Sequence, residues 1–403
     1  MVNKIARKGV SIAGLAAIIV TATFGARASN SVIPSYGQLL GREFRFSATG
    51  LGLLAVSFML SSFIASALIN ARLRTELRRK YFIASAAAYA IAYSLFYFAN
   101  PYLIWPAMVI AGLAMGPIMP NIMTSAGSVE DPRVRERLLA LYTLTLSVSL
   151  LVAQSVASLV LRYVSVRQGF LYLEPMAALV AISAPFLPFP KEASLARTVG
   201  PKGAQARASY VLKNEGFIAS VLNNLTYQVP FSYLTAFAAV YVVQQFGAKG
   251  WLGVLAYAPF YATSLLSRLF MMLRPPGNIV KHMVLAASMS VAGLLMAWAS
   301  GTLPVFYLAM AILGIPHGMT YTLSVISISR TFDRDRLNAA NSYFFSIMMI
   351  IGSLLPALLG SLADRIGYRQ TFLAITPIVI AILVLTLIFA SRARSLRSQQ
   401  LHP

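Results

Sequence analysis

Cysteine is absent from this chain of 403 residues, and acidic and imidazole side chains are scarce. The absence of cysteine excludes disulfides, thiolate chemistry and Cys-based metal sites. Only 11 Asp and Glu and three His are present, and His282, His317 and His402 lie too far apart in sequence to have metal-ligand spacing. The sequence therefore predicts neither a metal site nor a cofactor.

Charged residues are also few, at 11% of the chain against about 25% in an average soluble domain. Hydrophobic residues make up 58%, and the mean hydropathy is +0.72. Such a composition cannot cover a water-exposed surface of this size, so the sequence predicts a membrane protein. The chain contains no Gly-x-x-x-x-Gly-Lys-Ser/Thr string, so ATP-driven transport by this chain alone is not indicated.

The net charge of +22 raises the question of nucleic acid binding. The basic residues do not form a separate basic domain. They lie in short clusters between apolar runs, a pattern typical of loops at a membrane surface. The predicted partner is therefore the lipid bilayer and not a nucleic acid.

The chain nearly repeats itself at an offset of 202 residues. The matches keep their order and spacing without a gap, and they include glycine, proline and charged positions. A hydrophobic chain built as two parallel halves is a known transporter plan, with the substrate site between the halves. The matched pairs include Gly112 and Gly314, Gly116 and Gly318, Asp131 and Asp333, Arg167 and Arg369, Phe170 and Phe372, and Pro175 and Pro377.

Twelve apolar runs are long enough to cross a bilayer, which takes about 20 residues per helix. The sequence therefore predicts an all-α membrane protein of twelve transmembrane helices in two pseudo-symmetric bundles of six. The predicted spans are roughly 10–40, 47–71, 81–99, 102–128, 135–161, 168–189, 215–246, 250–273, 282–300, 303–330, 337–362 and 370–391.

The distribution of Lys and Arg over the loops predicts the orientation. Of the 33 basic residues, 24 fall in loops on the side of the N-terminus and seven on the other side. Arg27 and Arg268 fall inside spans. Because cytoplasmic loops carry the excess of basic residues, both termini are predicted in the cytoplasm, in a multi-pass protein of the plasma membrane. With one span fewer, every later loop would move to the other side of the membrane and the excess of basic residues on one side would disappear. The bias therefore also supports the count of twelve.

The longest predicted cytoplasmic connection lies at the midpoint of the chain and has no apolar period. It divides the chain into a first half at 1–190, a linker at 191–214, a second half at 215–391 and a tail at 392–403. An alternative concerns the N-terminus, where a basic cluster, an apolar run and Ala26-Arg27-Ala28 resemble a cleavable signal peptide. Cleavage would leave eleven spans and break the match between the halves, so we expect the segment to be retained.

The string Gly360-Ser-Leu-Ala-Asp364-Arg365-Ile-Gly367-Tyr368-Arg369 resembles the G-x-L-x-D-R-x-G-x-R signature of the major facilitator superfamily. Twelve spans in two halves joined by a cytoplasmic linker are also that family's plan, and the resemblance covers the whole chain. The signature is best known from the loop after the second helix, whereas here it falls between the eleventh and twelfth spans. The loop after the second span keeps a basic run but lacks the Asp and Gly, which puts the family's usual cytoplasmic gate in doubt.

Asp364, Arg365, Gly367 and Arg369 form the loop signature among the candidate functional residues. The Asp364 carboxylate can pair locally with Arg365 or Arg369 and cap the helix that follows. The alternative is a solvated turn with no role in transport, and this reading is favoured because exposed ion pairs contribute little.

Arg27 lies in the middle of the first predicted span. A buried cation costs at least about 2.5–3.5 kcal/mol on insertion scales, so Arg27 should face a cavity or a partner. One reading is contact with a substrate anion in the central cavity. The other is an internal structural ion pair.

Glu174 and His317 are the candidate groups for proton coupling. Glu174 is the one acid well inside a span, and a desolvated carboxylate can titrate in the working range. The alternative is that Glu174 lies in the interface or pairs with Arg27 or Arg167. His317 could titrate or bind substrate, or it could hydrogen-bond a neighbouring helix.

The seventh predicted span contains a polar stretch, Asn223-Asn224-Leu225-Thr226-Tyr227-Gln228, on which Asn224, Tyr227 and Gln228 share a face. Such a face should point to the protein interior. In the resembling family the first, fourth, seventh and tenth helices line the cavity, and helix–helix hydrogen bonding is the alternative role. The resulting cavity set is Arg27, Asn121, Asn224, Tyr227, Gln228, His317 and Tyr321.

These observations predict a monomeric secondary transporter, without enzymatic activity, that moves a small solute by alternating access. Arg27 suggests an anionic solute, while apolar aromatic walls would suit a drug-like one. Two other classes remain open at this point. A membrane-embedded enzyme acting on lipid-linked substrates would need paired carboxylates or a metal, and a non-transporting sensor would usually carry a soluble signalling domain.

Overall fold

The structure of the chain, a computed structural model, describes residues 12–70, 73, 75–127, 129, 131–189, 209–274, 276–332 and 334–401. Every regular element in these residues is a helix. Several predictions fall wholly or partly outside the described residues. They concern the N-terminal basic cluster, the basic loop at Arg72 and Arg74, residues 191–208 of the linker, and the last two residues of the tail.

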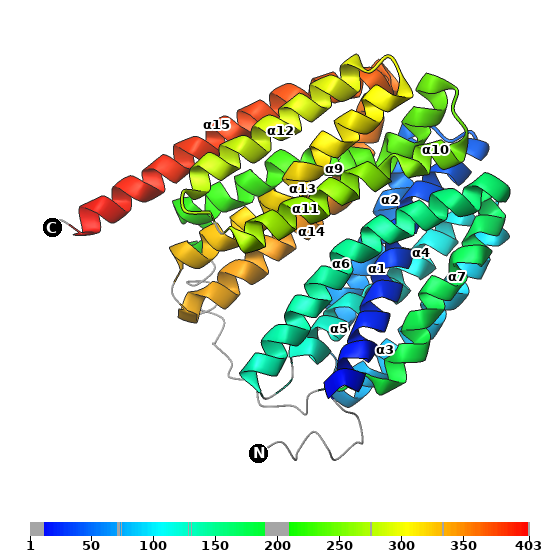
Figure 1. Cartoon of the computed structure of the whole chain (residues 1–403), viewed down its shortest axis with the longest axis horizontal. Helices are drawn as coiled ribbons and strands as arrows, with labels where there is room; N and C mark the ends of the chain where they lie inside the picture. The colour runs from blue at the N-terminus through cyan, green and yellow to red at the C-terminus, as the bar shows by residue number, and fades with distance from the viewer. Residues whose placement is uncertain are drawn as a thin grey trace. The chain divides into compact units, whose positions relative to one another are not determined.

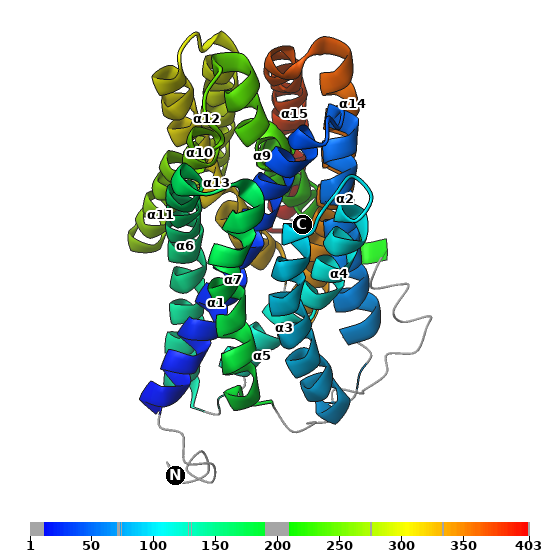
Figure 2. The ribbon, with the colours of Figure 1, turned by 90° about the vertical axis from the view of Figure 1, so that its right-hand side faces the viewer.

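The described helices fall into two compact units, each with its own interior. In unit 1, α1 packs against α6 and α7, and α3 packs against α7 (Figures 1 and 2). Unit 1 consists of Met1–Phe46, Leu53–Leu195 and Lys249–Leu255. Its helices are α1 (Ile12–Glu43), most of α2 (Ala48–Phe63) with the π-helical turn Ile64–Ile69, α3 (Thr75–Tyr97), α4 (Ile104–Met115), α5 (Ile118–Gly127), α6 (Pro132–Tyr163), α7 (Val166–Ser183) with the 3-10 turn Ala184–Phe186, and α10 (Gly250–Leu255).

Unit 2 consists of Ser47–Gly52, Ala196–Ala248 and Ala256–Pro403. Within it α13 packs against α9, α11 and α12, and α15 packs against α9 and α12. The first residues of α2 therefore count with unit 2, although they precede the rest of unit 2 by far in sequence. The helices of unit 2 are α9 (Glu215–Phe246), α11 (Tyr257–Leu273), α12 (Ile279–Ala299), α13 (Leu303–Thr331), α14 (Arg334–Ile366) and α15 (Tyr368–Leu401).

Each of the twelve predicted spans coincides with a helix or with two consecutive helices, which confirms the predicted fold class. Ten helices in the described residues are long and apolar enough to cross a membrane. The helices of the two remaining spans are α3, which begins with the charged stretch Thr75–Lys80, and the pair α10–α11. Pro259 lies four residues after Leu255, where α10 ends, and its missing N–H removes the helical hydrogen bond that would join α10 to α11.

The sequence repeat reappears as a repeat of close helix packing. In unit 1, a Cβ at Gly112 of α4 would collide with the carbonyl oxygen of Phe58 in α2; in unit 2, one at Gly314 of α13 would collide with that of Phe260 in α11. One turn further, Gly116 packs against Ser62 and Gly318 against Ser264. In each pair of contacts, the glycine and the residue that it packs against are both 202 residues apart in the two units. Each unit therefore needs glycine at the same two positions to let its two helices approach closely.

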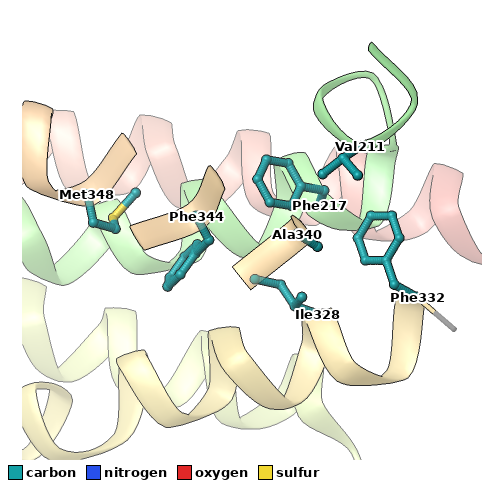
Figure 3. Packing of buried hydrophobic residues seen from close by; sticks show 7 residues of the cluster. All are labelled: Val211, Phe217, Ile328, Phe332, Ala340, Phe344 and Met348. Atoms are coloured by element: carbon teal, nitrogen blue, oxygen red, sulfur yellow. The ribbon is translucent and has the colours of Figure 1, made fainter. Parts of the chain in front are cut away.

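A cluster of buried apolar side chains ties α9, α13 and α14 together inside unit 2 (Figure 3). Phe217 comes from α9, Ile328 from α13 and Phe344 from α14. Burying an aromatic or aliphatic side chain of this size contributes about 1.5–3 kcal/mol each in water, and between helices in lipid the gain is mainly dispersion. The full cluster is Val211, Phe217, Ile328, Phe332, Ala340, Phe344 and Met348.

Candidate functional site

Arg27 lies near the middle of α1 and is half-buried inside unit 1. Among the described residues, no hydrogen bond or ion pair of its guanidinium is recorded, and its electrostatic neighbour is Tyr89 of α3. The structural ion pair considered from the sequence is therefore not found in the described part of the chain. A cation at this depth that pairs with none of the described residues is a candidate for binding an anion that comes from outside the protein.

Two further polar atoms lie on the face of α1 that carries Arg27. Thr23 precedes Arg27 by four residues and Asn30 follows it by three, so the three side chains are neighbours along the helix. Thr23 Oγ1 and Asn30 Oδ1 are both enclosed by protein and have no hydrogen-bond partner in the described residues. Because buried polar atoms are normally hydrogen-bonded, this stripe has binding capacity that the protein itself leaves unused.

Glu174 is placed differently from Arg27. Its Oε2 accepts a 2.9 Å hydrogen bond from Ser94 Oγ, which joins α7 to α3. No ion pair of Glu174 with Arg27 or Arg167 is recorded in the described part of the chain, and the Arg167 guanidinium lies 5.4 Å from the Phe44 ring. Glu174 thus serves as a helix–helix contact within unit 1.

His317 of α13 lies in an aromatic enclosure in unit 2 and is only 5% exposed. Its Nδ1 lies 2.6 Å from Ser264 Oγ of α11. The ring centroids of Tyr227, Phe231, Phe260 and Tyr261 lie 5.0, 4.8, 5.0 and 5.8 Å from the imidazole. Rings at this spacing pack against the imidazole from several sides and enclose it.

The polar stretch of α9 faces the interior of unit 2, as the sequence suggests. Asn223 Nδ2 donates to Thr320 O at 3.2 Å and to Ser324 Oγ at 2.8 Å, while Asn224 Nδ2 lies 2.8 Å from Met348 Sδ. Three other polar atoms of this stretch, and one of Thr320 on α13, have no hydrogen-bond partner in the described residues. They are Asn223 Oδ1, Asn224 Oδ1, Tyr227 Oη and Thr320 Oγ1.

The other predicted cavity residues have different surroundings. Asn121 is buried and donates to Asn70 Oδ1 at 2.9 Å, so it acts as a helix–helix contact. Gln228 Nε2 lies 3.5 Å from Ser232 Oγ and beside Gly352. Tyr321 is 43% exposed, with its ring 6.0 Å from that of Phe344.

The structure thus distributes the predicted set over the two units. Arg27 and Asn121 belong to unit 1, and Asn224, Tyr227, Gln228, His317 and Tyr321 belong to unit 2. Of the latter, Tyr227 and His317 are in direct ring contact.

Sequence reasoning missed Thr23 and Asn30 beside Arg27, and Thr320 and the phenylalanines beside His317. The signal for the first two was available, because their spacing of four and three residues from Arg27 places them on one helical face. The phenylalanines gave no signal, since aromatic residues are spread along the whole chain and only the packing of α9 and α11 on α13 selects these.

The Asp364 carboxylate caps α2 and not α15, contrary to the local cap considered from the sequence. It accepts hydrogen bonds from Ala48 N at 2.7 Å, from Thr49 N at 2.8 Å and from Thr49 Oγ1 at 2.5 Å. Gly360, one helical turn earlier, packs against the backbone of Ala48 and Thr49 so closely that a Cβ would collide with it. These contacts hold the first turn of α2 within unit 2.

The rest of this signature shapes the turn between α14 and α15. Gly367 has a φ of +83°, a conformation that favours glycine, and it links the two helices. Arg369 Nε donates to Trp298 O at 2.8 Å, which fixes the start of α15 to the end of α12. Arg365 is exposed.

In the described residues, no group of three or more His, Asp or Glu side chains is arranged to hold a metal ion.

Comparisons with known proteins agree with this architecture. The family model described as Major Facilitator Superfamily matches residues 14–274 and 278–402, which is nearly the whole chain. No curated protein sequence matches the chain.

Solved structures with the same fold share little sequence with the chain. A bacterial homologue of the human lysosomal transporter Spinster, in an inward-facing and occupied conformation, superposes with a TM-score of 0.73 at 12% identity, over 94% of this chain and 96% of that one. A mutant form of the nucleoside transporter NupG gives a TM-score of 0.71 at 12% identity, over 93% of this chain and 99% of that one. At these identities the likeness concerns the fold.

Proposed function

The chain belongs to the Major Facilitator Superfamily of multi-pass membrane transporters, and from this premise we propose that it moves a small solute with an anionic group across the plasma membrane by alternating access. The observation that carries the proposal is Arg27. It is a half-buried cation near the middle of a membrane helix, and no hydrogen bond or ion pair for it is recorded in the described residues.

The free energy of a charge inside a membrane protein supports this role. An unpaired guanidinium is costly at this depth, and the cost falls when an anion supplies the missing charge and hydrogen bonds. Thr23 and Asn30 add a hydroxyl and an amide on the same face. A carboxylate or phosphate with a neighbouring hydrogen-bond donor fits these three side chains, because Asn30 Oδ1 is an acceptor.

Unit 2 supports a second part of the proposal, that the solute also has a planar or apolar part. The rings around His317 offer such a group apolar contact, and Tyr227 Oη and Asn224 Oδ1 offer hydrogen bonds at its edge. If transport is coupled to protons, we assign the coupling to His317, because Glu174 is held by Ser94 in a helix–helix contact. We further propose that the transporter acts as a monomer with both termini in the cytoplasm.

The experiment starts from a thermal-shift screen of the purified chain against metabolites and drugs, followed by uptake into proteoliposomes of the solutes that stabilise it. Arg27→Gln is expected to raise the half-saturating concentration of an anionic solute by roughly 10–100-fold, since a charge-assisted hydrogen bond contributes about 1.5–3 kcal/mol. Arg27→Lys should retain part of the affinity because it keeps the charge.

The matched control is Arg162→Gln, which removes a charge from an exposed arginine in the last turn of α6 of the same unit. It should leave the half-saturating concentration within about twofold. Equal transport by the wild type and Arg27→Gln, or an equal loss in Arg162→Gln, would contradict the anion proposal. Preferred transport of neutral aromatic solutes would instead favour a drug-type exporter that relies on the rings around His317.

A further inference from the structure

A cavity of about 510 Å³ lies in unit 2, and neither His317 nor the aromatic rings around it line this cavity. Parts of α9, α12, α13 and α15 surround it, together with the loop that precedes α12. The residues that line it are Tyr210, Asn214, Glu215, Gly216, Ala219, Gly277, Asn278, Ile279, Val280, Met283, Ser327, Arg330, Thr331, Ala390 and Ala393.

The depth of this cavity in the membrane follows from the span limits. Glu215 and Ile279 are the first residues of two candidate membrane spans, and Thr331 and Ala393 are the last residues of two others. All four line the cavity. The cavity therefore lies where the hydrocarbon region gives way to water, at the level of the lipid headgroups, on the side that the charge bias predicts to be cytoplasmic.

One side of the cavity is suited to an anion. Arg330 donates to Pro276 O at 3.0 Å and to Gly277 O at 3.4 Å, which holds its guanidinium at the cavity. The α9 and α12 helices both start here, and their N-cap residues Asn214 and Asn278 each accept one backbone N–H. No acceptor is recorded in the described residues for the N–H groups of Glu215, Gly216, Ile279 and Val280. Two helix starts and a guanidinium favour a phosphate group.

A negatively charged side chain, that of Glu215, also lines the cavity. Glu215 Oε2 is enclosed by protein and has no hydrogen-bond partner in the described residues. A carboxylate oxygen in this situation lacks a donor, and leaving a buried charged acceptor unpaired is costly. A primary ammonium would supply both the donor and the charge.

We propose that this cavity binds a phosphate group that carries a primary amine, the chemistry of an aminophospholipid headgroup. The phosphate lies toward Arg330 and the two helix starts, and the ammonium lies toward Glu215. Ile279, Met283 and Ala390 provide an apolar wall on which the first carbons of acyl chains can rest. None of the residues assigned to solute contacts above lines this cavity, so the proposal does not depend on them.

The test compares the full-length protein in nanodiscs of phosphatidylethanolamine, phosphatidylcholine or phosphatidylglycerol, with thermal stability and lipid retention in native mass spectrometry as readouts. Phosphatidylethanolamine should be retained at least about tenfold better than phosphatidylcholine, whose quaternary amine has no N–H to donate. Glu215→Gln should abolish this preference, and Arg330→Gln should weaken retention of phosphatidylethanolamine. Lys281→Gln is the matched control, because Lys281 is exposed, lies at the same start of α12 and does not line the cavity.

Free O-phosphoethanolamine, added to lipid-free protein in detergent, distinguishes the two sources of the headgroup. If O-phosphoethanolamine stabilises the protein saturably and Glu215→Gln abolishes this effect, the headgroup chemistry is supported and the ligand need not be a lipid. Stabilisation by the acylated form alone supports a lipid. Equal retention of the three lipids, a preference that survives Glu215→Gln, or an equal loss in Lys281→Gln would overturn the proposal. The melting temperature of each variant without any probe shows that it is folded.

Discussion

At the scale of single residues, the polar side chains inside the membrane spans differ in how much of their hydrogen-bonding capacity the protein uses. Asn121 donates to Asn70, and Glu174 accepts from Ser94, so both connect neighbouring helices. Asn224 Oδ1 and Tyr227 Oη have no partner in the described residues. In an apolar medium an unused polar atom is costly, so we expect a solute or water to bind at these atoms.

This distinction separates the two candidate coupling groups. We expect Glu174→Gln to change the uptake rate less than about twofold, because glutamine still accepts from Ser94. We expect His317→Phe to lower uptake by about tenfold or more, since it keeps a ring in the aromatic enclosure but removes both ring nitrogens. Uptake into proteoliposomes with and without a proton gradient measures both variants.

The outcome that contradicts this assignment is a large loss of gradient-driven uptake in Glu174→Gln with unchanged uptake in His317→Phe. Ser264→Ala is an independent control, because it removes the hydroxyl that lies 2.6 Å from His317 Nδ1 and leaves the imidazole in place.

At the scale of helices, glycine sets how closely two pairs of helices approach. Gly314→Ala is expected to lower the free energy of unfolding by about 1–3 kcal/mol, because the new methyl group would collide with Phe260 O and Thr263 Oγ1. Gly301→Ala is the matched control, since a Cβ there meets nothing within 4 Å. Melting temperatures in detergent measure both, and equal stability of the two variants would show that α11 and α13 can move apart freely.

The cap on α2 gives a second prediction at this scale. Asp364→Ala removes the acceptor for three hydrogen bonds and should lower stability by about 0.5–2 kcal/mol, the usual range for losing an N-cap side chain. Asp364→Asn should lose less, because one oxygen remains. The neighbouring exposed Arg365→Ala should leave the melting temperature unchanged, and a loss equal to that of Asp364→Ala would argue against the cap.

Helix positions could be predicted from sequence where an apolar run ends at a turn residue. The predicted spans 215–246 and 250–273 match α9 and α10–α11 at both ends, since Gly247 takes the left-handed conformation that terminates α9. The start of α3 could not be predicted, because its first turns are charged and hydropathy detects only the apolar part. The partner of Asp364 lies 315 residues away in sequence, and no local pattern indicates it.

The candidate site could be predicted only in part for the same reason. Arg27 can be recognised from sequence because it is a charged residue within an apolar run. His317 can be recognised because the matching position of the other half, Met115, is not a histidine. Whether Asn121 or Asn224 is free to bind a solute depends on side chains of other helices, and a single sequence does not give those contacts. The roles of both sets of residues stay predictions.

At the scale of the whole molecule, the lack of cysteine makes the predicted orientation directly testable. A single cysteine at Lys249, exposed between α9 and α10, should react with a membrane-impermeant maleimide on intact cells. A cysteine at Lys281, exposed at the start of α12, should react only after permeabilisation. The unmodified chain is the blank for both. The reverse pattern would place the termini outside and contradict the orientation derived from the basic loops.

The first turn of α2 counts with unit 2, although the chain cut at its linker would leave this turn with the other fragment. Co-expression of the two fragments therefore tests whether the hydrogen bonds between Asp364 and the start of α2 form between separate chains, as well as whether the cut itself is tolerated. In the fragment that contains Asp364, the carboxylate would lack the donors that it has in the intact chain. The other fragment would expose those donors, the N–H groups of Ala48 and Thr49. Each fragment thus lacks a piece that the other supplies, so complementation in trans should fail more often when Asp364 is replaced by alanine than when Arg365 is.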